Sequence, residues 1–176
     1  MGRLQRTKGK VFERWVAQQF REAYPFLDGV RRSQQGAGAE QSDVTGVPGL
    51  WIECQDAARP TPLAKLVQAE RDVAEAKLQG ILPIAVVHRA GSSRTSTTVT
   101  LRAGAFLRLY GKGGCLEKWR TPPVTIGLSD FLNLAQTYVV LCLSRDDDDR
   151  SPKSAGAPGA TPQGRGARRD RKETNR

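Results

Sequence analysis

The stretch that decides the fold is "SDVTGVPGLWIECQ", residues 42–55. Its Val-Pro-Gly turn separates two short runs that are typical of β-strands, which predicts a β-hairpin. Because side chains along a strand alternate between its faces, Glu53 and Gln55 should share one face and Cys54 should lie on the other. Asp43 opens the partner strand and can therefore come close to Glu53.

Two amphipathic helices are expected on either side of this hairpin in the sequence. Residues 8–24 repeat apolar residues at helical spacing, and Pro25 ends the run. Residues 59–80 begin with prolines and stop at a glycine. The expected buried stripe of the first helix is Phe12, Trp15, Val16, Phe20 and Ala23, and that of the second is Leu63, Leu66, Val67 and Val73.

Three further segments are typical of strands. Residues 26–33 predict a short strand, and residues 97–110 predict a strand followed by a short helix. Residues 81–89, "ILPIAVVHR", form an uninterrupted apolar run of the kind found in a strand covered on both faces. The order helix, three strands, helix, strand predicts an α/β fold in which helices pack against a mixed sheet.

A partial echo occurs later in the chain. Residues 124–134, "VTIGLSDFLNL", repeat the pattern of residues 99–109, "VTLRAGAFLRL". The echo suggests a small β–α duplication, although one match of this length is weak evidence for a repeat. Residues 131–143 are expected to form a final packed helix or a helix followed by a strand.

The charge of the chain is unevenly distributed. Its net charge is +10 over 176 residues, and from Arg145 onward it has no large aliphatic or aromatic residue. Such a segment cannot offset its ordering entropy by burial, which predicts a disordered tail over residues 145–176 after a folded domain over residues 1–144. The domain carries most of the positive charge, which favours a polyanion such as nucleic acid, with solubility alone as the other interpretation.

The number and spacing of the cysteine and histidine residues argue against a disulfide framework, a structural zinc site and a histidine base. Cys54, Cys115 and Cys142 are widely spaced, so neither a disulfide framework nor a structural zinc site is predicted. His88 is the only histidine, and a structural or surface role is favoured over that of a catalytic base. No signal peptide and no transmembrane run is visible, so we expect a cytoplasmic protein without a membrane partner.

The carboxylates suggest a metal site. Asp43 and Glu53 would repel each other unless a cation lay between them, and their oxygen ligands suit Mg²⁺ or Mn²⁺. Glu13, at the rim of the apolar stripe of the first helix, could overhang the end of the sheet. The plainer alternatives are a turn role for Asp43, a solvated sheet face for Glu53 and an ordinary helix surface for Glu13.

Five motifs occur in a characteristic order over about residues 8–110. They are "GKVFERWVA" with Glu13, the pair Ser42-Asp43, "WIECQ" with Glu53, "KLVQAE" with Gln68, and "GILPIAVVHR". In this order and spacing the chain resembles the PD-(D/E)xK nucleases. Within that superfamily it is most similar to the Holliday junction resolvases and to small phage-encoded resolvase-like proteins.

The resemblance implies a restriction-endonuclease-like core that hydrolyses phosphodiesters of DNA, with branched DNA as the substrate. Asp43 and Glu53 would bind Mg²⁺ or Mn²⁺ together with the Cys54 carbonyl, Glu13 would complete the shell, and Gln68 would orient groups nearby. Resolvases of this kind act as homodimers, for which residues 131–143 are a candidate surface. The implied location is the cytoplasm of a bacterium or of a phage-infected host.

One position departs from the family pattern. Gln55 stands where these nucleases usually have a lysine, and its amide carries no charge. Lys65, on the following helix, could instead bring an ammonium to the site. A catalytically weakened or inactive DNA-binding module of the same fold therefore stays open, as does an interaction protein tethered by its basic tail.

Four basic residues are expected to contact nucleic acid. Lys8, Lys10, Arg31 and Arg32 cluster at the start of the first helix and on the next strand. Cations gathered in this way are suited to phosphate. An ordinary solvated face is the alternative.

Overall fold

The predicted hairpin forms and belongs to a larger sheet. The computed structural model describes residues 3–33, 41–109 and 121–150. Within them a six-stranded sheet has the order β1-β2-β3-β4-β5-β6. The elements are α1 (Arg3–Ala23), β1 (Arg31–Arg32), β2 (Val44–Thr45), β3 (Leu50–Ala57), α2 (Pro62–Glu75), β4 (Leu82–Arg89), the 3₁₀ turn η1 (Arg94–Ser96), β5 (Thr98–Arg102), α3 (Ala103–Leu109), β6 (Pro123–Gly127) and α4 (Leu128–Arg150).

The sheet is mixed, as predicted. Strands β3 and β4 pair in parallel over their whole length, and every other neighbouring pair is antiparallel. A parallel pair needs a crossover connection, which α2 supplies between β3 and β4. The α/β fold with a mixed sheet and flanking helices is therefore confirmed.

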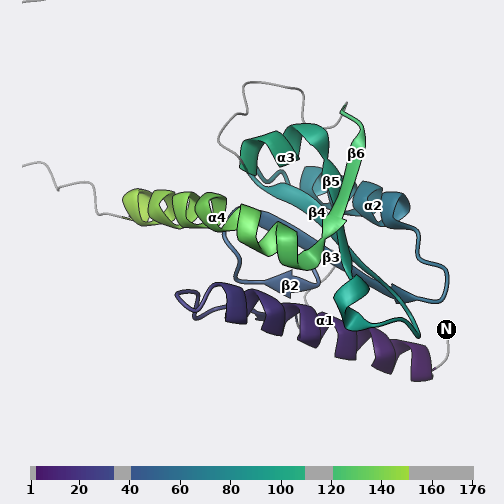
Figure 1. Cartoon of the computed structure of the whole chain (residues 1–176). Helices are drawn as coiled ribbons and strands as arrows, with labels where there is room; N and C mark the ends of the chain where they lie inside the picture. Colours follow the sequence, from purple (N-terminus) through teal and green to yellow (C-terminus); the bar gives the residue numbers. More distant parts are fainter. Residues whose placement is uncertain (1–2, 34–40, 110–120, 151–176) are drawn as a thin grey trace, which may run out of the picture.

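The helices cover both faces of the sheet. The larger core cluster unites α1, α3 and α4 with one face, through side chains such as Phe12, Phe20, Ile52, Ile84 and Phe131. Helix α2 packs on the other face, where Leu66 meets Ala85 and Val87, and Ala69 and Val73 meet Trp51. Figure 1 shows α4 in front of the sheet and α2 behind it.

The buried stripe of α2 is partly different from the predicted one. Leu63 and Val67 are 49% and 48% exposed, whereas Leu66, Val73 and the unpredicted Ala69 are buried. The small side chain of Ala69 lets the helix approach the sheet at that position. The same rotation of the helix turns Val67 outward and carries Lys65 and Gln68 toward the sheet.

The C-terminal part of the described chain repeats a strand–helix arrangement. Units β5–α3 and β6–α4 follow each other as the echo suggested, and residues 131–143 are helical throughout. Helix α4 continues to Arg150, so the predicted domain boundary at residue 144 falls inside it, and residues 145–150 are helical instead of disordered. Adding residues to an existing helix costs no new nucleation, which favours this extension.

Two sequence expectations cannot be placed on this fold. Residues 151–176, the rest of the predicted tail, and Cys115 lie outside the described residues.

No helix in the described part of the chain combines the length and the hydrophobicity that a membrane span requires.

Candidate functional site

Asp43 is fixed where β2 meets β3. Its backbone N–H donates to the Ile52 carbonyl at 2.9 Å, and its Oδ2 accepts from the Cys54 N–H at 2.8 Å. The carboxylate thus takes the place of a backbone carbonyl in the strand ladder. A plain turn role would not require this second bond, which holds the carboxylate beside β3.

Glu53 lies on the face of β3 that α2 covers, and it is only 3% exposed. Its Oε1 accepts from Trp51 Nε1 at 3.1 Å. Its Oε2 accepts from Lys65 Nζ at 2.7 Å and from Gln68 Nε2 at 3.3 Å. The interpretation of Glu53 as a residue of a solvated sheet face is therefore wrong.

Lys65 joins the two carboxylates. Its Nζ lies 2.7 Å from Glu53 Oε2 and 3.7 Å from Asp43 Oδ2, and it also donates to Gln68 Oε1 at 3.3 Å. The Lys65 ammonium therefore supplies a cation between Asp43 and Glu53, whose mutual repulsion calls for one.

One ammonium does not neutralise two carboxylates. Burial raises the pKa of Glu53 to about 7, the charge of Asp43 adds to this, and Lys65 only partly opposes it. Burial alone would lower the pKa of Lys65, but the charges of Glu53 and Asp43 outweigh it and raise that pKa. With both carboxylates ionised, the cluster would carry one negative charge more than Lys65 offsets, and a second cation would favour that ionised form.

Glu13 approaches the same region from α1. Its carboxylate accepts from Arg32 Nε, and burial followed by the charge of Asp43 raises its pKa. Burial also raises the pKa of the Cys54 thiol, and the charges of Asp43, Glu13 and Glu53 add to that rise. The ion-pair partner of Glu13 is Arg32, whereas Asp43 and Glu53 share Lys65.

The side chains around Asp43 and Glu53 offer oxygen donors to a divalent cation. Nowhere in residues 3–33, 41–109 and 121–150 are three His, Cys, Asp or Glu side chains gathered as a ready metal site. Asp43 and Glu53, however, already hold one cation between their oxygens. Oxygen donors with unbalanced negative charge are what Mg²⁺ and Mn²⁺ prefer, so this pair fits such an ion as a two-residue site.

Gln55 is committed elsewhere. Its Oε1 accepts from the Thr61 N–H at 2.8 Å, and its Nε2 lies 3.3 Å from Thr61 Oγ1. Both ends of the amide thus brace the start of α2. Among the described residues, only Lys65 brings an ammonium within ion-pair distance of Asp43 or Glu53.

Two residues of the site, Trp51 and Thr61, were not predicted. The two-residue period of the strand could have placed Trp51 on the same face as Glu53. Nothing in the sequence singles out Thr61.

The four basic residues that are expected to contact nucleic acid differ in solvent exposure and in ion pairing. Lys8, Lys10 and Arg31 are exposed. Arg32 is mostly buried and pairs with Glu13, and its second terminal nitrogen is buried without a hydrogen-bond partner in the described structure. Three of the four are therefore accessible to a polyanion, and Arg32 first of all orients Glu13.

His88 is buried and has a structural environment. Its Nδ1 lies 3.0 Å from Asp56 Oδ1, and its ring packs against that of Phe12. Ser92 Oγ lies 3.4 Å from Nε2, but the hydroxyl donates to the Arg89 carbonyl at 2.6 Å. The Ser92 hydroxyl is thus engaged by the Arg89 carbonyl, and the His88 ring by Asp56 and Phe12.

Comparison with family models, curated proteins and solved structures found no match. The likeness to PD-(D/E)xK nucleases therefore depends on the motif residues themselves.

Proposed function

We propose that this chain is a divalent-metal-dependent endonuclease that hydrolyses DNA, with branched DNA as its substrate. The observation that carries the proposal is the convergence of Asp43, Glu53 and Lys65. They come from the lead-in to β2, from β3 and from α2, and they surround one point on the sheet. Two carboxylates and an ammonium are the groups that metal-assisted phosphodiester hydrolysis needs.

Each residue has a distinct role in this proposal. Asp43 and Glu53 would hold Mg²⁺ or Mn²⁺, the Cys54 carbonyl would help them, and Glu13 would complete the shell directly or through water. The bound ion would supply positive charge for the phosphate and lower the pKa of an attacking water. Lys65 offsets the charge that develops on the phosphate, which the neutral amide of Gln55 cannot do. Gln68 steadies both Lys65 and Glu53.

The proposal extends to assembly and location. Cleavage of two symmetric strands calls for a homodimer, and Val140 and Leu141 are exposed on α4, within the candidate dimer surface. The proposed place of action is the cytoplasm of a bacterium or of a phage-infected host.

A DNA-binding module without cleavage activity is the second candidate. The observation that favours it is the engagement of Gln55 by Thr61, which gives the position a bracing role in place of a catalytic one. In that case the ion pairs of Lys65 serve only to stabilise the buried Glu53.

The deciding experiment is cleavage by the purified chain. A labelled four-way junction and a linear duplex of the same sequence are incubated with protein in Mg²⁺, in Mn²⁺ or in EDTA, with Asp43→Asn as the control. The nuclease proposal expects metal-dependent cleavage of the junction that the variant lacks. Binding without cleavage in either metal would favour the second candidate.

A further inference from the structure

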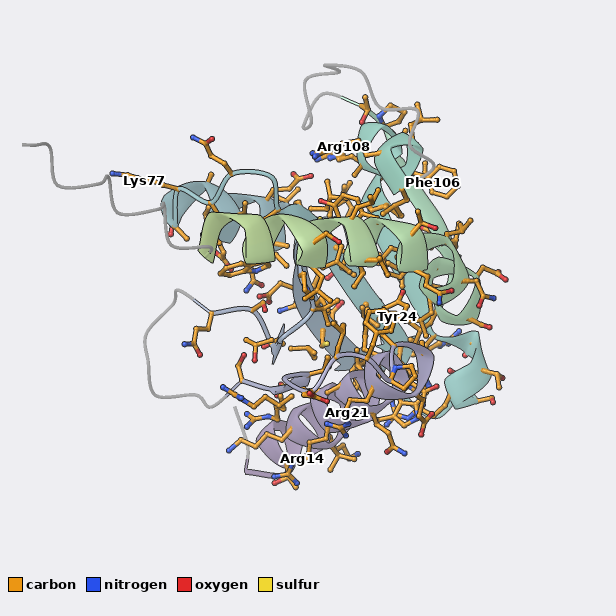
Figure 2. All side chains as sticks on the ribbon, turned by 90° about the vertical axis from the view of Figure 1, so that its left-hand side faces the viewer. Arg14, Arg21, Tyr24, Lys77, Phe106 and Arg108 are labelled. Atoms are coloured by element: carbon orange, nitrogen blue, oxygen red, sulfur yellow. The ribbon has the colours of Figure 1, made fainter. Side chains whose placement is uncertain are left out.

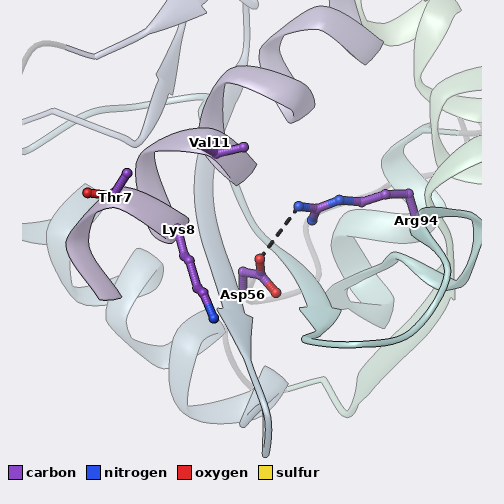
Figure 3. A pocket seen from close by; sticks show the side chains of 5 residues that line it. All are labelled: Thr7, Lys8, Val11, Asp56 and Arg94. Atoms are coloured by element: carbon purple, nitrogen blue, oxygen red, sulfur yellow. Dashed lines mark ion pairs between the residues drawn. The ribbon is translucent and has the colours of Figure 1, made fainter. Parts of the chain in front are cut away.

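A second basic site lies on the opposite face of β3 from Glu53. A cavity of about 200 Å³ is lined by Thr7, Lys8 and Val11 of α1, Asp56 of β3 and Arg94 of η1. Figure 3 shows Lys8 and Arg94 on two sides of Asp56. Side chains alternate along β3, so Asp56 faces α1, as Cys54 does.

Arg94 is held in place by the surrounding protein. Its guanidinium lies over the rings of Phe12 and Trp15, 4.8 and 5.3 Å from their centroids, and its NH2 nitrogen lies 3.6 Å from Asp56 Oδ2. The side chain is still 36% exposed. A guanidinium that is fixed by stacking and yet open on one side loses little entropy when it binds a phosphate.

The acidic residue in the cavity does not cancel its positive charge. Asp56 Oδ1 is engaged by His88 Nδ1 at 3.0 Å, while Oδ2 faces Arg94. Lys8 is exposed, and no carboxylate of the described chain forms an ion pair with it. With Lys8 and Arg94 positive and Asp56 negative, the cavity keeps a net positive charge and suits an anion.

The position of the cavity relates it to the proposed active site. Asp56 follows Glu53 by three residues on β3, which corresponds to about 10 Å along the strand. Because the cavity lies on the other face of the sheet, a DNA strand that contacts both places passes around the end of β3, and a phosphate other than the reacting one would lie against Lys8 and Arg94.

The same edge of the sheet carries more positive charge. Arg89 ends β4 beside Ala57 of β3, and both Arg59 and Arg89 are exposed. This is the carboxyl edge of the parallel pair β3–β4, where ligands of open α/β sheets commonly bind.

We propose that Lys8 and Arg94 form a second phosphate subsite, which holds the DNA backbone at a phosphate other than the reacting one. The identity of this ligand as DNA rests on the proposed function. The subsite positions the strand and takes no part in the chemistry.

The test measures binding apart from cleavage. Binding of a fluorescein-labelled four-way junction to the full chain is measured in EDTA at several salt concentrations, for wild type, Lys8→Gln, Arg94→Gln and Arg94→Lys. Lys77→Gln is the matched control, because Lys77 follows α2 at the amino edge of β4 and lies far from α1 (Figure 2). Lys8→Gln and Arg94→Gln should each weaken binding about threefold to tenfold and make the salt slope shallower by about one.

Two further results sharpen the test. Arg94→Lys keeps the charge but loses the stacked fork, so it should recover part of the affinity. Single methylphosphonate linkages, which neutralise one phosphate each, are then placed along the junction arms. At one or two positions they should weaken binding of wild type and leave Lys8→Gln and Arg94→Gln nearly unaffected.

The outcomes separate this subsite from the nuclease proposal. If Lys8→Gln and Arg94→Gln bind as tightly as wild type, or lose no more than Lys77→Gln, the subsite is wrong even where cleavage is observed. If they weaken binding as expected while wild type cleaves nothing in Mg²⁺ or Mn²⁺, the subsite stands and the nuclease proposal fails.

Discussion

Lys65 stands at a position of α2 from which one side chain touches both carboxylates. If it supplies the charge that Gln55 lacks, Lys65→Ala should lower cleavage of a four-way junction by about two to three orders of magnitude. Gln55→Lys should add little, because Lys65 already brings an ammonium to Glu53 and Asp43, and the change also removes the bonds of the Gln55 amide to Thr61. Single-turnover rates in saturating Mg²⁺ check this. A fully active Lys65→Ala enzyme together with strong activation by Gln55→Lys would assign the charge to position 55 instead.

The two carboxylates can be tested without disturbing the fold greatly. Asp43→Asn keeps an oxygen that can accept from the Cys54 N–H, and Glu53→Gln keeps one for Lys65. Each should abolish cleavage while DNA binding is kept or becomes tighter, because negative charge near the phosphate is removed. Gel-based cleavage and anisotropy on the same samples give both quantities. Cleavage that persists in both variants would exclude this site.

Glu53 should also make stability depend on pH. Burial and Asp43 raise its folded-state pKa from 4.5 to about 7. Between these two values the folded chain keeps a proton that the unfolded chain has lost, so the free energy of unfolding should fall as pH rises through this window and level off above it. Urea unfolding in EDTA from pH 4 to 8 measures this. Glu53→Gln should lose much of the fall, and an equal fall in the variant would assign it to other groups.

At the level of elements, the β2–β3 turn is packed against α4. Gly49 has φ +74°, and a Cβ there would lie 2.5 Å from Cys142 Sγ and 2.8 Å from a ring carbon of Tyr138. Gly80 has φ +77°, but a Cβ there would meet nothing within 4 Å. The pair therefore separates backbone strain from close packing.

Alanine at these two glycines should have unequal effects. Gly80→Ala should cost about 1–2 kcal/mol for the left-handed backbone alone. Gly49→Ala should cost about 1–3 kcal/mol more, because α4 or the turn must shift. Chemical denaturation of both variants gives the difference. Equal losses would show that α4 does not press on the turn.

The sequence predicted the order of elements well because each signal is local. The hairpin and the two-residue period of β3 sufficed to bring Asp43 to Glu53. The buried face of α2 was predicted less well. Leu63 and Val67 are as apolar as Leu66, and only packing against the sheet decides which of them is buried. For the same reason a helical wheel could not show that Gln68 would contact Glu53, and no local pattern joins Arg94 to Phe12 and Asp56.

On the scale of the whole molecule, positive charge reaches past the described fold. Residues 151–176 contain no large aliphatic or aromatic side chain, and their lysines and arginines outnumber their acidic residues. Such a segment adds electrostatic attraction to DNA without adding to a hydrophobic core. The acidic run at residues 146–149 instead belongs to the helical end of α4, so it separates the fold from the basic segment.

Removal of residues 151–176 should therefore separate affinity from stability. The melting temperature should stay nearly unchanged, whereas affinity for linear duplex at low salt should fall and depend less steeply on salt. Both changes in binding follow from the loss of phosphate contacts by Arg165, Arg168, Arg169, Arg171 and Lys172. Thermal unfolding and salt-dependent anisotropy measure the two properties on one preparation. The cut follows Arg150 so that α4 is kept whole, and a second truncation after residue 144 gives the contribution of its last turns. A large drop in melting temperature from the first truncation would mean that these residues pack on the fold.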